Sequence, residues 1–140
     1  MLTDNEKKNI RETFAMVEPI ATTAAELFYN RLFDIAPQVK PLFKHTDMEQ
    51  QGRHLMQTIG ILVHSIDRLD TFKPHLQKLG QNHIKYGAES GHYAVVGEAL
   101  LWTLQQGLGE VFTEEVAEAW TKLYTFVAES AQEAYTPELN

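Results

Sequence analysis

The 140-residue chain contains no cysteine, which excludes disulfide bonds and thiol chemistry. Any bound metal must therefore be held by histidine or carboxylate side chains. The chain also lacks a run of about 20 apolar residues, the length that a bilayer-spanning helix needs. Its first residues are too polar for a signal peptide. We therefore expect no membrane partner and a cytoplasmic location.

Basic residues are few and scattered along the sequence. The chain has 12 lysine and arginine residues against 19 aspartate and glutamate residues, a formal net charge of −7. Proteins that bind nucleic acid need clustered basic side chains that neutralise phosphates. We therefore expect no nucleic-acid partner.

Strand-like alternation of polar and apolar residues is nearly absent, whereas apolar residues recur at helical spacing almost everywhere. Ile10, Phe14 and Val17 show this spacing after Thr3, which forms a capping-box signature with Glu6. Further helices are predicted from about residue 20 to 35, 48 to 66, from near 72, from 92 to 108 and from 113 to about 135. The length fits one domain, placed at residues 1–140. The predicted fold class is all-α.

One histidine shares a helix face with apolar residues. Leu76, Leu79 and His83 fall at i, i+3 and i+7, so the imidazole points where the leucines point. Position alone favours a core histidine that bonds a backbone carbonyl, with a metal ligand as the alternative. A ligating imidazole also needs an acceptor for its second nitrogen. The carbonyl of Leu79, one turn earlier, is placed to accept that bond.

Two longer segments resemble a known family. The run LGQNHIKYGAESGHYAVVGEALL (residues 79–101) resembles the proximal half of the haem pocket in bacterial globins and in the globin domains of flavohaemoglobins. The segment LFYNRLFDIAPQVKPLF (residues 27–43) resembles the distal helix and corner of the same family. The resemblance extends from about Thr3 to Tyr135. It implies a single-domain bacterial globin, with roughly six to eight helices around a pocket for haem b.

The resemblance implies roles for residues on both sides of the haem. His83 matches the proximal histidine, the protein ligand of the iron. Tyr29 matches the distal tyrosine, Gln51 the distal glutamine and Leu55 the apolar residue over the iron. Gln50 adjoins Gln51, and a shift of one residue would exchange them.

Other residues are expected to line the cofactor. Phe43 matches a phenylalanine that stacks on the haem, and Tyr93 resembles a tyrosine that approaches the proximal imidazole. Tyr86, Val96 and His54 are further expected contacts, with His54 near the haem propionates. Core packing is the simpler alternative for Phe43 and Tyr93, and a solvated helix face is the alternative for His54.

Such a pocket implies a protein that binds dioxygen for storage, transport, scavenging or sensing. Bound dioxygen gains negative charge, and the Tyr29 hydroxyl and the Gln51 amide can donate hydrogen bonds to it without becoming cations. Each bond of this kind contributes about 1.5–3 kcal/mol. We therefore expect tight binding and slow release of dioxygen, with nitric oxide and carbon monoxide as other ligands.

An enzyme is the alternative, namely a nitric oxide dioxygenase that converts nitric oxide and oxygen into nitrate. Flavohaemoglobins carry a reductase module after the globin domain. The sequence ends at Asn140, so we expect an external reductase to supply electrons. A flavohaemoglobin glutamate beside the proximal histidine matches Tyr135 here, with Glu133 two residues away. This departure favours oxygen binding over peroxidase-like chemistry. A haem-free globin-like domain is a third possibility, against which His83 argues.

Overall fold

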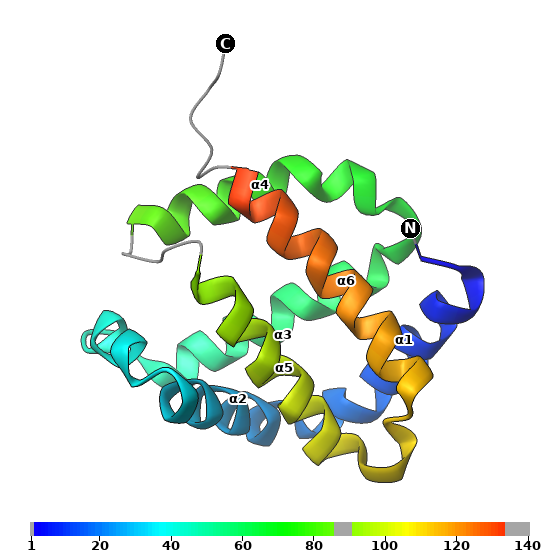
Figure 1. Cartoon of the computed structure of the whole chain (residues 1–140), viewed down its shortest axis with the longest axis horizontal. Coiled ribbons are helices and arrows are strands. Elements are labelled where there is room, and N and C mark those ends of the chain that lie inside the picture. Colours follow the sequence, from blue (N-terminus) through cyan, green and yellow to red (C-terminus); the bar gives the residue numbers. More distant parts are fainter. Residues whose placement is uncertain (1, 86–90, 134–140) are drawn as a thin grey trace.

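The computed structural model describes residues 2–85 and 91–133, which form α-helices joined by short 3-10 helices. The helices cross one another around a shared interior (Figure 1). Their bounds are α1 Asp4–Val17, α2 Ala21–Ile35, α3 Met48–His64, α4 Leu69–Lys85, α5 His92–Leu108 and α6 Glu114–Gln132. The 3-10 helices are η1 Glu18–Ile20, η2 Pro37–Phe43, η3 Ile66–Arg68 and η4 Gly109–Val111. The all-α prediction is confirmed.

Local side chains determine where the first and last helices begin. The Thr3 hydroxyl accepts the Glu6 amide at 3.1 Å, and the Glu6 carboxylate accepts the Thr3 amide at 2.8 Å. This is the capping box that the sequence predicts, and it satisfies amides that have no partner within the helix. Thr113 caps α6 by accepting the amide of Val116.

Two predicted helix ends differ from the structure. The helix expected to run to Ile66 ends at His64, and the next begins at Leu69 rather than near Phe72. Ser65 donates its amide to carbonyls of the preceding turn, and the chain then tightens into the 3-10 turn η3. The apolar spacing therefore continues across a short change of helix type, which periodicity cannot detect.

The larger of two apolar clusters lies where α1, α3, α4, α5 and α6 meet. Ile10, Ile66 and Trp120 are its largest fully buried side chains. The Trp120 indole nitrogen donates a hydrogen bond of 2.9 Å to the Thr13 hydroxyl. That bond compensates for burying the indole N–H, which would otherwise be costly.

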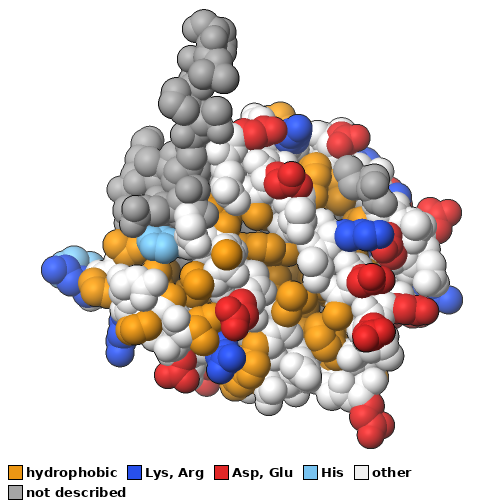
Figure 2. Space-filling model, viewed as in Figure 1, with side chains coloured by type: hydrophobic (Ala, Val, Ile, Leu, Met, Phe, Trp, Pro, Cys, Tyr) orange, Lys and Arg blue, Asp and Glu red, His pale blue; other side chains and the backbone are white. Residues whose placement is uncertain are grey.

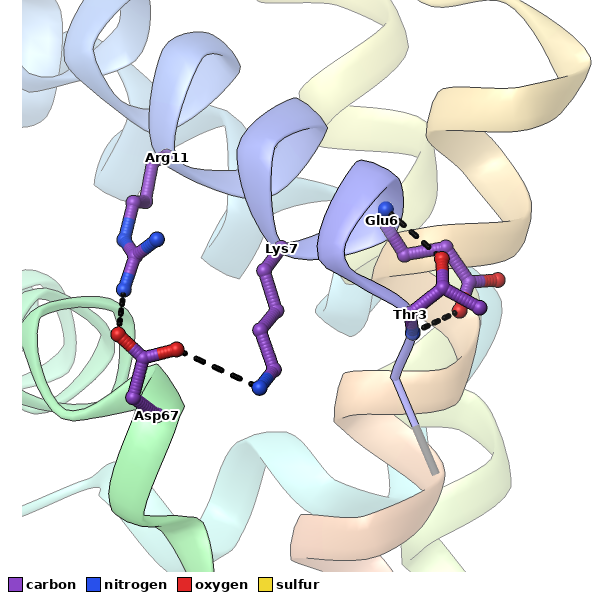
Figure 3. A network of polar contacts seen from close by, with 5 residues as sticks. All are labelled: Thr3, Glu6, Lys7, Arg11 and Asp67. Atoms are coloured by element: carbon purple, nitrogen blue, oxygen red, sulfur yellow. Dashed lines mark hydrogen bonds and ion pairs between the residues drawn. The ribbon is translucent and has the colours of Figure 1, made fainter.

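An exposed ion-pair network connects α1 to η3. Lys7 and Arg11, one turn apart on α1, both contact the Asp67 carboxylate, and the Lys7 nitrogen lies 3.3 Å from it (Figure 3). The hydrogen bond from Arg11, followed by that from Lys7, lowers the pKa of Asp67. Because these groups face solvent, the network orients the turn between α3 and α4 and adds little stability.

The backbones of α4 and α6 touch at Gly80. A Cβ placed on Gly80 would lie 2.0 Å from the carbonyl oxygen of Ala131. No side chain therefore fits at this position. The contact holds α4 against α6 one turn before His83. None of the described helices combines the length and apolar character needed to cross a membrane.

Replacing Gly80 with alanine should lower the free energy of unfolding by about 1–3 kcal/mol, the usual cost of overpacking. The Ala131 carbonyl belongs to the backbone, so α6 itself would have to move. Gly60→Ala is the matched control, because its Cβ would lie 3.6 Å from the Phe14 ring, an ordinary contact. Urea unfolding measures both variants, and equal stability would contradict the backbone contact.

Candidate functional site

His83 lies on α4 with its ring half-buried, on the same face as the buried Leu76. Its Nδ1 atom is 2.7 Å from the carbonyl oxygen of Leu79. A carbonyl can only accept a hydrogen bond, so Nδ1 carries the proton and Nε2 keeps its lone pair. The bond expected from the spacing is therefore present, and it leaves Nε2 suited to bind a metal.

Tyr29 and Gln51 form a hydrogen bond between α2 and α3. The Tyr29 side chain is buried, and its hydroxyl oxygen accepts the Gln51 side-chain amide at 3.1 Å. Because the oxygen accepts this bond, the phenolic proton stays available for donation to another group. Gln50 is exposed. The structure therefore joins Gln51, rather than the exposed Gln50, to Tyr29.

Aromatic rings surround Tyr29. Phe28 meets it edge-on with centroids 4.9 Å apart, and Phe43 meets it edge-on at 5.7 Å. Phe33 lies 5.4 Å from Phe43 and 6.1 Å from Tyr29. These edge contacts are favourable ring geometries. They bring Phe43 from η2 beside Tyr29 from α2, two residues that the sequence assigns to one pocket.

The second apolar cluster is built around Tyr29 from α2, η2, α3 and α5. Partly buried apolar side chains pack around its buried members: Phe33, Ile35, Phe43, Met48, Leu55, Val95, Val96 and Leu100. The cluster thus brings together three residues predicted to line the cofactor, namely Phe43, Leu55 and Val96. Phe33, one helical turn after Tyr29, joins this cluster although its spacing alone did not predict it. The half-exposed side chains offer an apolar surface to a broad apolar molecule.

Burial controls the ionisation of Tyr29. Desolvation raises the pKa of its phenol, and the hydrogen bond from Gln51 opposes this effect more weakly. The phenol is therefore neutral at ordinary pH and acts as a donor.

Tyr29 also lines a cleft of about 820 Å³ between α2 and α3.

Tyr124 holds the start of α5 against α6. Its hydroxyl donates a hydrogen bond of 2.6 Å to the Tyr93 carbonyl, and burial raises the pKa of its phenol. A Cβ on Gly97 would lie 2.8 Å from the Tyr124 ring, so the glycine makes room for it. This packing positions Val96. The approach of Tyr93 to the proximal imidazole stays a prediction.

The other predicted residues lie apart from this cluster or outside the described residues. His54 is exposed on α3, so its contact with a propionate stays a prediction. The Glu133 carboxylate accepts the Gln77 amide and lies 3.3 Å from Lys73. Tyr86 and Tyr135 are outside the described residues. Figure 2 shows hydrophobic side chains across the middle of the face that carries α5 and α6.

The fold is all-α, and the site combines the buried Tyr29, hydrogen-bonded to Gln51, with a partly buried apolar cluster. The family model named Globin matches residues 26–131. The chain belongs to the globin family, and the predicted globin fold is confirmed. Membership of this family, together with flavohemoprotein relatives, implies haem as the cofactor and a gas as the ligand.

Curated relatives agree with this assignment. A flavohemoprotein of Vibrio cholerae serotype O1 is 30% identical over 131 residues, covering 92% of this chain and 33% of the relative. A flavohemoprotein of Xylella fastidiosa is 32% identical over 122 residues, covering 85% of this chain and 30% of the relative. The chain thus spans about a third of the length of these flavohemoproteins. Neuroglobin-1 of Oncorhynchus mykiss is 29% identical over 139 residues, covering 90% of this chain and 87% of the relative.

A solved structure has the same fold. It is an engineered carbene transferase built from a Rhodothermus marinus protein that is assigned as a nitric oxide dioxygenase. The TM-score is 0.84 at 21% identity, covering 96% of this chain and 94% of that one.

Alkaline titration tests the burial of Tyr29 and Tyr124. Their pKa values lie above the ordinary value of about 10. The stability that each contributes is therefore present below pH 10 and is lost as the pH rises through the folded pKa. We expect phenolate absorbance from these two of the five tyrosines only above pH 10, together with falling stability.

Tyr29→Phe should remove one of these late-titrating groups from the absorbance curve. Ionisation of every tyrosine near pH 10 in the folded wild-type protein would contradict the prediction.

Proposed function

We propose that this chain is an oxygen-binding haem globin in which His83 ligates the iron and Tyr29 and Gln51 hydrogen-bond the bound dioxygen. The observation that supports this most strongly is the hydrogen bond between Gln51 and the buried Tyr29. It presents neutral donors inside an apolar cluster, where a polar ligand has few other partners. Haem supplies the iron to which a diatomic gas coordinates.

The residues present fit a haem group. Haem is a broad apolar plate that needs an apolar slot and one axial nitrogen ligand. The half-buried Phe43, Leu55 and Val96 supply apolar surface from three elements. His83 supplies the nitrogen, because its Nδ1 proton is held by the Leu79 carbonyl and Nε2 keeps its lone pair.

The distal residues favour dioxygen over uncharged gases. A phenol with a raised pKa stays protonated, so Tyr29 donates its hydrogen to a ligand that gains negative charge. Gln51 orients the phenol by donating to its oxygen. A hydrogen bond to a charged group contributes about 1.5–3 kcal/mol, which corresponds to a roughly ten- to hundredfold change in affinity.

Nitric oxide dioxygenation is a second candidate, supported by the same Tyr29–Gln51 pair. One nitric oxide molecule, one dioxygen molecule and one electron give one nitrate ion, and an external reductase would supply the electron. The test measures the nitrate formed per protein molecule in the presence of a reductase. Nitrate formation that stops at one equivalent would support binding as the main role. Sustained nitrate formation would support the enzyme.

The proximal side supports binding as the main role. The partner of His83 Nδ1 is a neutral carbonyl, and the Glu133 carboxylate is engaged by Lys73 and Gln77. A neutral acceptor polarises the imidazole less than a carboxylate would. Weaker electron donation to the iron disfavours peroxidase-like chemistry.

His83→Ala should abolish the axial ligation of haem, whereas His75→Ala should not. His75 is an exposed histidine two turns earlier on the same helix, so it is a matched control. Absorption spectra of the ferric, reduced and air-exposed proteins measure the change. The wild type and His75→Ala should share a Soret band and an oxygenated spectrum. A colourless wild type that takes up no added haem would instead support the haem-free globin-like domain.

Tyr29→Phe should raise the oxygen dissociation rate about ten- to hundredfold, because the charge-assisted bond from the phenol is lost. Gln51→Leu should raise it less, because the phenol still donates to the ligand after the amide's bond to dioxygen and its contact with the phenol are lost. Gln50→Leu is the matched control and should keep the wild-type rate. Stopped-flow displacement of oxygen by carbon monoxide measures all three. An unchanged rate in Tyr29→Phe would refute the proposed distal role.

A further inference from the structure

The helices α2 and α3 make a close contact at Ala25 and Gly52. A Cβ placed on Gly52 would lie 2.9 Å from the Cβ of Ala25. Nonbonded carbon atoms prefer separations of about 3.5–4.0 Å. The Ala25 methyl is attached directly to the backbone, so no rotation can move it aside. A side chain at position 52 would therefore force the two helices apart.

This contact adjoins the Tyr29–Gln51 hydrogen bond on both helices. Tyr29 follows Ala25 by one turn on α2, and Gln51 directly precedes Gly52 on α3. The bond measures 3.1 Å, near the upper end of the usual range of about 2.7–3.2 Å. A separation of a few tenths of an ångström between the helices would therefore break it or weaken it strongly.

We propose that Gly52 is a positioning residue for the distal pair. Its missing side chain lets α3 approach α2 closely enough for the Gln51 amide to reach the Tyr29 hydroxyl. This inference rests on the proposed role of that pair in holding dioxygen. Gly52 acts through the distance between the two helices.

The same helix supplies a matched control. Gly60 also faces a neighbouring helix, but a Cβ there would lie 3.6 Å from the Phe14 ring, which is ordinary van der Waals contact. Gly60→Ala and Gly52→Ala make the same change in helix propensity in the interior of α3. A difference between them therefore reports the contact with Ala25.

The methyl group at this contact can also be moved from one helix to the other. Ala25→Gly combined with Gly52→Ala moves the methyl group from α2 to α3 and removes the clash. The double variant should thus recover the spacing that the single variant loses. Such a rescue isolates a direct interaction between two positions from a general loss of stability.

The test compares Gly52→Ala, the double variant and Gly60→Ala in the haem-loaded protein. The readouts are the oxygen dissociation rate and the C–O stretching frequency of the carbon monoxide complex, which reports hydrogen bonding to the ligand. Gly52→Ala should raise the rate up to about tenfold and shift the frequency to that of Gln51→Leu. The double variant should return within about twofold of wild type, and Gly60→Ala should match wild type.

Different outcomes of these experiments would overturn the proposed function and the role of Gly52. If Tyr29→Phe slows oxygen release or leaves its rate unchanged, the proposed function fails. If Tyr29→Phe accelerates release while Gly52→Ala keeps the wild-type rate and frequency, Gly52 has only a packing role and the inference is overturned. It is also overturned if the double variant does not recover.

The double variant covers the case in which Gly52→Ala does not fold. Ala25→Gly removes the methyl group that the new Cβ would meet, so Ala25→Gly/Gly52→Ala should fold and keep the oxygen dissociation rate within about twofold of wild type. A double variant that folds but releases oxygen as fast as Gln51→Leu would overturn the inference.

Discussion

Close packing between helices determines where the pocket residues lie. At Gly80 the backbone of α4 touches the Ala131 carbonyl, and at Gly52 α3 touches the Ala25 methyl. Each of these glycines lies within three residues of a side chain that the site depends on, His83 and Gln51. Protein interiors are packed too tightly for such contacts to absorb an extra methyl group without movement. The spacing of the helices that carry His83 and Gln51 therefore depends on two residues that have no side chain.

His83 and Tyr29, the residues proposed to hold the haem and the gas, both have neutral hydrogen-bond partners. His83 is oriented by a backbone carbonyl, and Tyr29 accepts a hydrogen bond from an amide. Burial keeps the Tyr29 phenol protonated by raising its pKa. The Glu133 carboxylate is paired with Lys73. In the proposed function, these neutral contacts favour retention of a polarised gas ligand over its cleavage.

Helices and their caps were predictable because they depend on local spacing. Ile10, Phe14 and Val17 are buried as their periodicity predicts, and Thr3 caps α1 together with Glu6. The end of α3 and the start of α4 were not predicted correctly. Apolar spacing continues through η3, where a tighter turn replaces an α-helical one. A pattern of apolar residues reports the buried face and is insensitive to that change.

The sequence by itself determined the all-α class and the apolar helix face that carries His83, and it selected candidate residues for a cofactor pocket. These depend on side-chain type and on spacing within one helix. Only the tertiary structure decided that Gln51 reaches Tyr29, that Phe33 joins Phe43 beside it, and that Glu133 binds Lys73. Each of these contacts joins different elements of the chain. Their distances depend on how closely helices approach, which is set by packing at positions such as Gly52 and Gly80.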